Sequence, residues 1–180
     1  MLLITGVLVF FFSGKPVIYI SFRIGKDFKP FKMYKCRTMS KESSTQLSKI
    51  LKDNHTAKME FLKYNKLKED PRITRNGKLL RKTSLDELPQ FLNVLIGNMS
   101  IVGPRPVLIQ SFNDIQNYKD TVFKFKPGIT GLWQVSGRNK TTFKRRLELD
   151  TWYVLNWSIF LDILIIFKTI FKVLKAEGAY

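Results

Sequence analysis

The chain has 180 residues, which is enough for one domain with its own hydrophobic core, and no internal repeat indicates a second domain. Its 31 Lys and Arg residues outnumber its 14 Asp and Glu residues, and the resulting net charge of +17 predicts an anionic partner: a nucleic acid, an acidic membrane surface or a phosphorylated substrate. The single cysteine, Cys36, excludes an intramolecular disulfide.

The chain begins with an uncharged apolar segment, residues 1–14. This segment is shorter than the ~20 residues that a helix needs to span a bilayer. It also lacks the basic region and the small-residue cleavage site of a secretory signal. Three interpretations stay open: a core helix, half of a re-entrant hairpin, or the remnant of a longer anchor.

Two β-rich runs follow, over residues 17–24 and 28–39, and the sequence Gly-Lys-Asp between them is a hairpin signal. Alternation along the second run places Lys35 and Arg37 on one face, about 6.5 Å apart, where both can bind one diphosphate. Solvated charges on an edge strand are the alternative.

Residues 41–70 are polar, with Leu47, Ile50 and Leu51 at helical spacing, which predicts a helical insertion of one or two amphipathic helices. His55 lies there without further metal ligands, so we expect no chemistry from this segment. Basic residues then recur at every third position and lead into an acidic pair. They are Arg72, Arg75, Lys78 and Arg81.

Asp86 and Glu87 form this acidic pair. Ser84, three residues before Glu87, fits a capping box in which Glu87 only satisfies backbone donors. Pro89 instead suits the first position of a helix that starts near Leu88 and ends at Gly97. Both registers place the acidic pair at a helix N-terminus.

The ionisation of the acidic pair follows from that position. The helix macrodipole and the neighbouring Arg81 and Lys82 favour the charged carboxylates. An ionised aspartate there is able to attack phosphorus or to ligate a metal. A helix N-terminus with ordinary first-turn acids is the alternative.

Arg105 lies between Pro104 and Pro106, which fix φ on both sides of it. A guanidinium on so stiff a backbone suits bidentate phosphate binding, and a structural turn with an exposed arginine is the alternative. Residues 127–138 form a glycine-punctuated loop and short strand, which predicts either a nucleotide cradle or a simple hairpin.

Aromatic, aliphatic and lysine residues recur at helical spacing over residues 152–174. This pattern predicts one helix, either buried in the core or lying among lipid headgroups. Because the chain carries +17 and begins with an apolar segment, we favour attachment to an anionic cytoplasmic leaflet.

Six sequence blocks occur in a fixed order: KCRTM (35–39), DPRIT (70–74), LRKTSLDELPQ (80–90), NVLIGNMS (93–100), GPRP (103–106) and KPGITGLWQVSGR (126–138). With them the chain resembles the bacterial sugar transferases of the monotopic phosphoglycosyl transferase superfamily, from about residue 22 to residue 180. Within that superfamily it looks most like the undecaprenyl-phosphate galactose or glucose phosphotransferases.

The resemblance implies an α+β fold, mostly helical with a small β-hairpin, held on one side of a membrane by interfacial amphipathic helices. Residues 1–14 would be a partial membrane anchor, the second half of a re-entrant helix. Residues 15–180 would be a single catalytic domain. Family members begin with a longer apolar segment, so either the start is misassigned, or the chain is truncated, or it is a natural short form.

The implied reaction moves a hexose-1-phosphate from a UDP-sugar to undecaprenyl phosphate and releases UMP, at the cytoplasmic face of the bacterial inner membrane. It is the first membrane step of surface polysaccharide synthesis, and downstream glycosyltransferases are the expected partners. Asp86 would be the nucleophile, Glu87 would support it, and both would bind Mg²⁺. The phosphate-binding residues implied are Arg105, Arg81, Lys35 and Arg37, and the nucleotide-binding residues are Gly128, Gln134 and Arg138.

Two other functions fit parts of the sequence. A catalytically inactive membrane scaffold would retain the fold without the reaction. A basic nucleic-acid-binding module would explain the charge but neither the apolar start nor the acidic pair, so we expect no nucleic-acid partner. No motif specifies which hexose is transferred.

Overall fold

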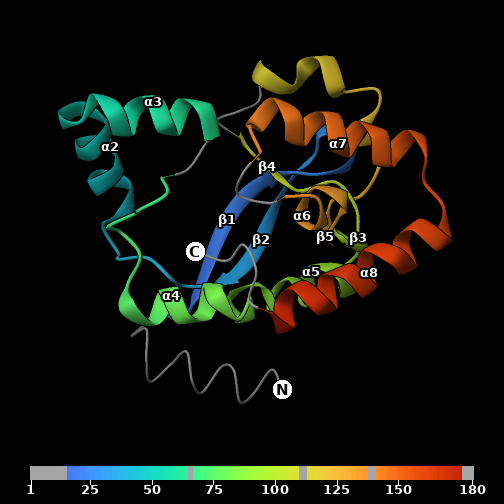
Figure 1. Cartoon of the computed structure of the whole chain (residues 1–180), viewed down its shortest axis with the longest axis horizontal. Helices are drawn as coiled ribbons and strands as arrows, with labels where there is room; N and C mark the ends of the chain where they lie inside the picture. The colour runs from blue at the N-terminus through green and yellow to red at the C-terminus, as the bar shows by residue number, and fades with distance from the viewer. Residues whose placement is uncertain (1–15, 65–66, 110–112, 138–140, 176–180) are drawn as a thin grey trace.

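The structure is a computed structural model that describes residues 16–64, 67–109, 113–137 and 141–175. It has the expected mixture of helices with small sheets (Figure 1). The strands are β1 (Ile18–Ile24), β2 (Pro30–Cys36), β3 (Ser100–Val102), β4 (Val107–Leu108) and β5 (Gly128–Thr130). The α-helices are α2 (Ser43–Asp53), α3 (His55–Tyr64), α4 (Arg75–Lys82), α5 (Gln90–Leu95), α6 (Leu132–Val135), α7 (Phe143–Leu155) and α8 (Ile159–Leu174). Short 3₁₀ helices are η1 (Lys26–Phe28), η2 (Leu85–Glu87), η4 (Asn113–Tyr118) and η5 (Val122–Lys124).

The predicted hairpin is present. β1 and β2 are antiparallel, with Ile18 opposite Cys36, and β4 pairs with the other edge of β1. The turn between β1 and β2 contains η1, where Asp27 and Phe28 take φ values of 54° and 60°. β2 is shorter than the predicted run at both ends. Phe28 belongs to η1, and beyond Arg37, whose N–H still donates to the Val17 carbonyl at 2.8 Å, Met39 bridges to Ile73 before α4.

The second sheet pairs β3 with β5 in parallel and α6 follows, so the described part of residues 127–138 is not the hairpin that one interpretation predicted. The two backbones touch at Gly103 and Gly128. A Cβ on Gly128 would lie 2.7 Å from Gly103 Cα, so neither backbone has room for a side chain there. The N–H of Gly128 also donates to the Pro104 carbonyl at 2.8 Å. This contact holds the segment before Arg105 against the segment that leads into α6.

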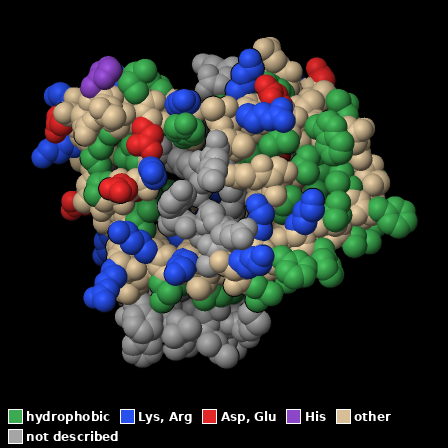
Figure 2. Space-filling model, in the orientation of Figure 1, with side chains coloured by type: hydrophobic (Ala, Val, Ile, Leu, Met, Phe, Trp, Pro, Cys, Tyr) green, Lys and Arg blue, Asp and Glu red, His purple; other side chains and the backbone are tan. Residues whose placement is uncertain are grey.

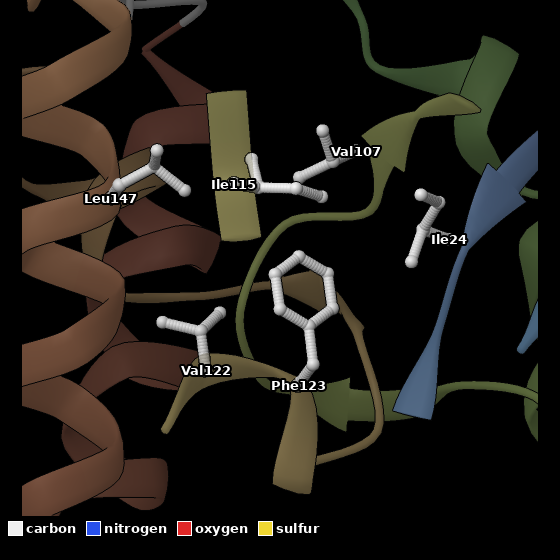
Figure 3. Packing of buried hydrophobic residues seen from close by; sticks show 6 residues of the cluster. All are labelled: Ile24, Val107, Ile115, Val122, Phe123 and Leu147. Carbon is white, nitrogen blue, oxygen red and sulfur yellow. The ribbon is translucent and has the colours of Figure 1, made fainter. Parts of the chain in front are cut away.

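The largest apolar cluster joins the first sheet to α7. It consists of Ile24, Val107, Ile115, Val122, Phe123 and Leu147 (Figure 3). A second cluster packs α7 and α8 against β3, with Val102, Tyr153 and Ile165 buried at its centre. Fully burying a side chain of this size contributes ~1.5–3 kcal/mol, so the two clusters are the main connection between the sheets and the C-terminal helices.

Asn93 connects α5 to the hairpin. Its side chain is fully buried, at 0% exposure, and it binds the backbone of β2 in the way that a neighbouring strand would. Oδ1 accepts the N–H of Tyr34 at 3.0 Å, and Nδ2 donates to the carbonyl of Lys32 at 2.7 Å. These two bonds fix α5, and therefore the η2 turn before it, at the outer edge of the sheet.

The C-terminal region, residues 152–174, divides between α7 and α8, where the sequence predicted one helix. Ser158 breaks the continuity because its backbone is extended and its hydroxyl caps the first turn of α8. Asp162 fixes the joint, accepting the hydroxyl of Tyr153 at 2.7 Å and the indole N–H of Trp157 at 3.2 Å.

Large apolar side chains remain exposed on α8. Figure 2 shows hydrophobic side chains gathered on the right-hand side of the molecule, where α8 lies in Figure 1. The residues of this helix exposed by about half or more are Ile159, Phe160, Ile163, Leu164, Phe167, Ile170, Phe171 and Leu174. In the four described ranges, no helix combines the length and the hydropathy needed to span a membrane.

Candidate active site

The acidic pair lies in η2, the single 3₁₀ turn between α4 and α5. The predicted capping box does not form, because Ser84 takes a left-handed conformation at φ 56° to turn the chain after α4, and its side chain caps nothing. α5 begins at Gln90, with Pro89 as its N-cap. Asp86 and Glu87 therefore precede α5, but they lie in the first turn of η2, so the predicted position at a helix N-terminus is confirmed for this 3₁₀ turn and not for α5.

Asp86 is buried, at 8% exposure. Its removal from water is the largest influence on its carboxyl and raises the pKa above the ordinary 3.8; Lys35 opposes this shift and Glu87 adds to it. Arg81 and Arg105 also lower the pKa, but less. The basic neighbours lower the pKa as expected, but desolvation outweighs them and the net direction of the shift is upward.

Glu87 is held by two cations from distant parts of the chain. Lys35 Nζ, from β2, lies 2.7 Å from Glu87 Oε1, and the guanidinium of Arg105 lies 3.7 Å from the same oxygen. The side chains of Lys35 and Glu87 are 17% and 18% exposed, so the ion pair is shielded from water without being sealed. The structure thus brings together the predicted site residues Lys35, Glu87 and Arg105, and Asp86 is the neighbour of Glu87 in the chain.

The segment that carries Arg105 is fastened at both sides of the residue. The Arg105 N–H donates to Asp150 Oδ2 at 3.3 Å, and Arg146 donates to the Arg105 carbonyl at 2.8 Å. Both partners come from α7. The guanidinium of Arg105 lies over the ring of Trp133 at 5.2 Å, and that of Arg146 lies 5.5 Å from the same ring. The side chain of Arg105 is therefore positioned by α6 and α7 as well as by its prolines.

The pair Arg146–Asp150 is deeply buried. Desolvation raises the pKa of Asp150 to about 6, against the opposing charge of Arg146, and desolvation lowers the pKa of Arg146 to about 10. Within the described residues, Asp150 Oδ1 and Arg146 Nε have no hydrogen-bond partner. The pair serves the backbone of Arg105 and leaves part of its own hydrogen-bonding capacity unused.

Arg81 and Arg37 differ in their placement. Arg81 donates to Thr38 Oγ1 at 3.0 Å and lies close enough to Asp86 for the two charges to influence each other. The guanidinium of Arg37 instead donates to the Pro16 carbonyl at 3.0 Å and lies 5.8 Å from the ring of Tyr19. Arg81 joins the cations around the acidic pair, whereas Arg37 is bound at the end of the hairpin.

Two of the predicted nucleotide-binding residues, Gly128 and Gln134, lie near the β3–β5 contact. Gly128 packs directly on Gly103. Gln134, in α6, is buried at 5% exposure and donates to the carbonyl of Ile129 at 3.3 Å, and its Oε1 has no partner among the described residues. Arg138 lies outside the residues that the structure describes.

Sequence reasoning missed three residues of this region: Arg23 in β1, and Arg146 and Asp150 in α7. The spacing of Arg146 and Asp150, four residues apart in a helix, was a usable signal for an ion pair. Arg23 gave a weaker one, a single cation in a strand that is otherwise mostly apolar.

The carboxylates of the site suit Mg²⁺ in kind and number. No group of three or more His, Cys, Asp or Glu residues able to hold a metal occurs in the part of the chain that the structure describes. Mg²⁺ commonly takes one or two carboxylates from the protein and its other ligands from water and substrate phosphates. The adjacent carboxylates of Asp86 and Glu87 are such a donor set.

Comparison with known proteins finds relatives whose names describe similar transferases. The chain is 49% identical to the UDP-galactose-lipid carrier transferase of Erwinia amylovora over 97% of its length and 37% of the relative's. It is 48% identical to the undecaprenyl-phosphate galactose phosphotransferase of Salmonella typhimurium, over 93% of its length and 35% of the relative's. It therefore spans little more than a third of these two proteins.

A shorter relative is matched over most of its length. The exopolysaccharide production protein ExoY of Sinorhizobium fredii is 44% identical over 99% of this chain and 79% of its own. The family model described as bacterial sugar transferase matches residues 1–176. The chain belongs to the bacterial sugar transferase family.

Proposed function

We propose that the chain transfers a hexose-1-phosphate from a UDP-sugar to undecaprenyl phosphate and releases UMP. The observation that supports this most is the buried Asp86 beside an ion-paired Glu87, within a cluster of Lys35, Arg81 and Arg105. The names of the relatives, a galactose-lipid carrier transferase and an undecaprenyl-phosphate galactose phosphotransferase, support the same substrate classes.

The proposed reaction has two displacements at one phosphorus atom. In the first, an oxygen of ionised Asp86 attacks the sugar-bearing phosphorus of the donor, the bond to the bridging oxygen breaks, and UMP leaves with that oxygen and its electron pair. In the second, an oxygen of undecaprenyl phosphate attacks the same phosphorus and the Asp86 carboxylate leaves unchanged. The lipid then carries a diphosphate bearing the sugar.

The cations make these steps electrostatically possible. Both reactants are anions, so their approach costs free energy unless fixed positive groups lie around them. Lys35 and Arg105 position Glu87 and face the reacting region, and Arg81 acts on Asp86. We assign phosphate binding to these three and to Arg37, and nucleotide binding to Gly128, Gln134 and Arg138.

Mg²⁺ bound by Asp86 and Glu87 would neutralise charge on the diphosphate. A cation bound there would oppose the upward shift that burial gives the pKa of Asp86. Arg81 and Arg105, which already lower this pKa, favour the ionised form that attack requires.

We place the reaction on the cytoplasmic face of the bacterial inner membrane. The exposed apolar residues of α8 support this, as do Leu95 and Ile96 at the end of α5, which are 83% and 63% exposed. Exposed apolar patches of this kind mark membrane or protein contacts. Residues 1–14 would add the second half of a re-entrant helix, and downstream glycosyltransferases would extend the lipid-linked sugar into a surface polysaccharide.

The test is release of UMP by the chain in detergent micelles with Mg²⁺, undecaprenyl phosphate and a panel of UDP-sugars. Asp86→Asn should abolish release with every donor. Asp53→Asn, an exposed carboxylate in α2, is the matched control and should leave it unchanged. Equal release by Asp86→Asn and the control would refute the proposed nucleophile, and an inactive wild-type chain would favour the scaffold function.

A further inference from the structure

β1 buries Ser21 and half-buries Arg23, whereas four of its five apolar or aromatic side chains are exposed and only Ile24, at its end, is buried. Residues on one face include Ser21 and Arg23 of β1 and Met33 of β2, which lies opposite Ser21. Ser21 and Met33 are 5% and 3% exposed, whereas Ile20 and Phe22 on the other face are 47% and 54% exposed. An ordinary amphipathic strand has the reverse pattern. Ser21 and Arg23 therefore lie on a partly buried face of β1 that also carries the buried Met33.

The guanidinium of Arg23 lies on this face with little compensation. Its Nε donates to Ser21 Oγ at 3.0 Å. Among the described residues, no carboxylate lies within 4.0 Å of Arg23, whereas the buried Arg72 is paired with Asp70. The side chain of Arg23 is half-buried, and the attraction of Glu87 acts on it from beyond that distance. A guanidinium that is partly withdrawn from water and has no ion-paired carboxylate is suited to bind an anionic ligand.

Arg23 also faces the reaction centre. Lys35, which binds Glu87, lies on the same face of the hairpin as Arg23. It is opposite Tyr19, four residues before Arg23 in β1. On its other side Arg23 pairs with Leu108 of β4, three residues after Arg105. Desolvation, followed by the positive charges of Arg105 and Arg146, lowers the pKa of Arg23 to about 10, as expected for guanidinium groups gathered in one place.

Charge counting over this region leaves an excess of cations. Five cationic side chains, those of Arg23, Lys35, Arg81, Arg105 and Arg146, accompany the three carboxylates of Asp86, Glu87 and Asp150. The excess of two positive charges matches one phosphate monoester dianion. The planar fork of a guanidinium whose Nε is already bound can present its two Nη groups to phosphate oxygens together.

We propose that Arg23 and Arg105 form a phosphate-binding subsite beside the acidic pair, oriented on the Arg23 side by Ser21. Its ligand is a phosphate monoester, supplied either by the nucleotide product or by the lipid acceptor. The subsite rests on the proposed function for its biological ligand, but its binding of phosphate does not require the transfer reaction.

The experiment measures binding of inorganic phosphate, UMP and farnesyl phosphate by the chain in detergent micelles, without Mg²⁺ or donor. Arg23→Gln should weaken binding of the preferred ligand by at least about tenfold, as expected for a charge-assisted pair. Arg23→Lys should bind with intermediate affinity, because it keeps the charge and loses the fork. Arg145→Gln, an exposed arginine elsewhere on α7, is the control and should bind like wild type.

Thermal unfolding without ligand supplies the second readout. Arg23→Gln should unfold at a higher temperature than wild type, because it removes a half-buried positive charge that is repelled by Arg105 and Arg146. A lower unfolding temperature would show that Arg23 has a structural role and would overturn the proposal, as would binding equal to that of Arg145→Gln. Asp86→Asn should lose UMP release yet still bind phosphate, which separates failure of the subsite from failure of the proposed reaction. Tighter binding of UMP assigns the subsite to the nucleotide, and tighter binding of farnesyl phosphate assigns it to the lipid.

Discussion

Replacing Asn93 with alanine should destabilise the fold by about 2–3 kcal/mol. The substitution deletes both hydrogen bonds to β2, those to the Tyr34 N–H and the Lys32 carbonyl. A polar group left unsatisfied costs about 1–3 kcal/mol when it is buried. Lys32 is exposed and Tyr34 is half-buried, so water can bind part of the two backbone groups that lose their partner. The expected loss of stability is therefore near the lower limit for two unsatisfied groups.

Urea unfolding of the chain in detergent micelles measures this loss as a change in the free energy of unfolding. Asn98→Ala is the matched control, since Asn98 is exposed just beyond α5. Asn93→Asp should destabilise at least as much as Asn93→Ala, because its second carboxylate oxygen would face the Lys32 carbonyl and would bring a charge into a fully buried position. If Asn93→Ala is no less stable than Asn98→Ala, the side chain of Asn93 does not hold α5 on the sheet.

Three further outcomes are expected. Because burial raises the pKa of Asp86, kcat/KM for the donor should rise with pH along a limb centred above 3.8, and a flat profile from pH 4 upward would contradict this. Asp150 has a pKa of about 6 in the folded state, above its ordinary 3.8, so the native state binds the proton more tightly than the unfolded state does. Relative to Asp150→Asn, the free energy of unfolding of the wild type should therefore fall as pH rises from 4 to 6. A rise over this pH range would contradict the burial of Asp150. Phe167→Glu on α8 should reduce co-sedimentation with anionic phospholipid vesicles, whereas Thr56→Glu on α3 should not; equal reductions would point to net charge rather than to the apolar face of α8.

Local signals in the sequence predicted the local structure. The glycine-containing turn and two β-rich runs predicted the hairpin, and Gly97 ends the α5 region at φ 88°, where glycine is favoured. The break at Ser158 was missed, because apolar residues continue on both sides of it and the periodicity hides a change of direction.

The electrostatic state of the site depended on contacts that no local pattern contains. Asp86 reads as a solvated first-turn acid, yet distant segments cover it and reverse the direction of its pKa shift. The partners of the Arg105 backbone come from α7, 41 and 45 residues along the chain. Arg23 was passed over because a strand's inner face is normally apolar, and only the register of β1 reveals that this one is not.

The contact between Gly103 and Gly128 bears on how related sequences are compared. The main chain of each occupies the volume where the other's side chain would begin, so a glycine at either position answers a steric demand of the β3–β5 pair. A column of invariant glycines at Gly128 would then be expected whether or not a nucleotide touches it. Gln134 is more informative, because its Oε1 has no partner among the described residues. Differences at this position between related sequences would reflect differences in the ligand bound beside it.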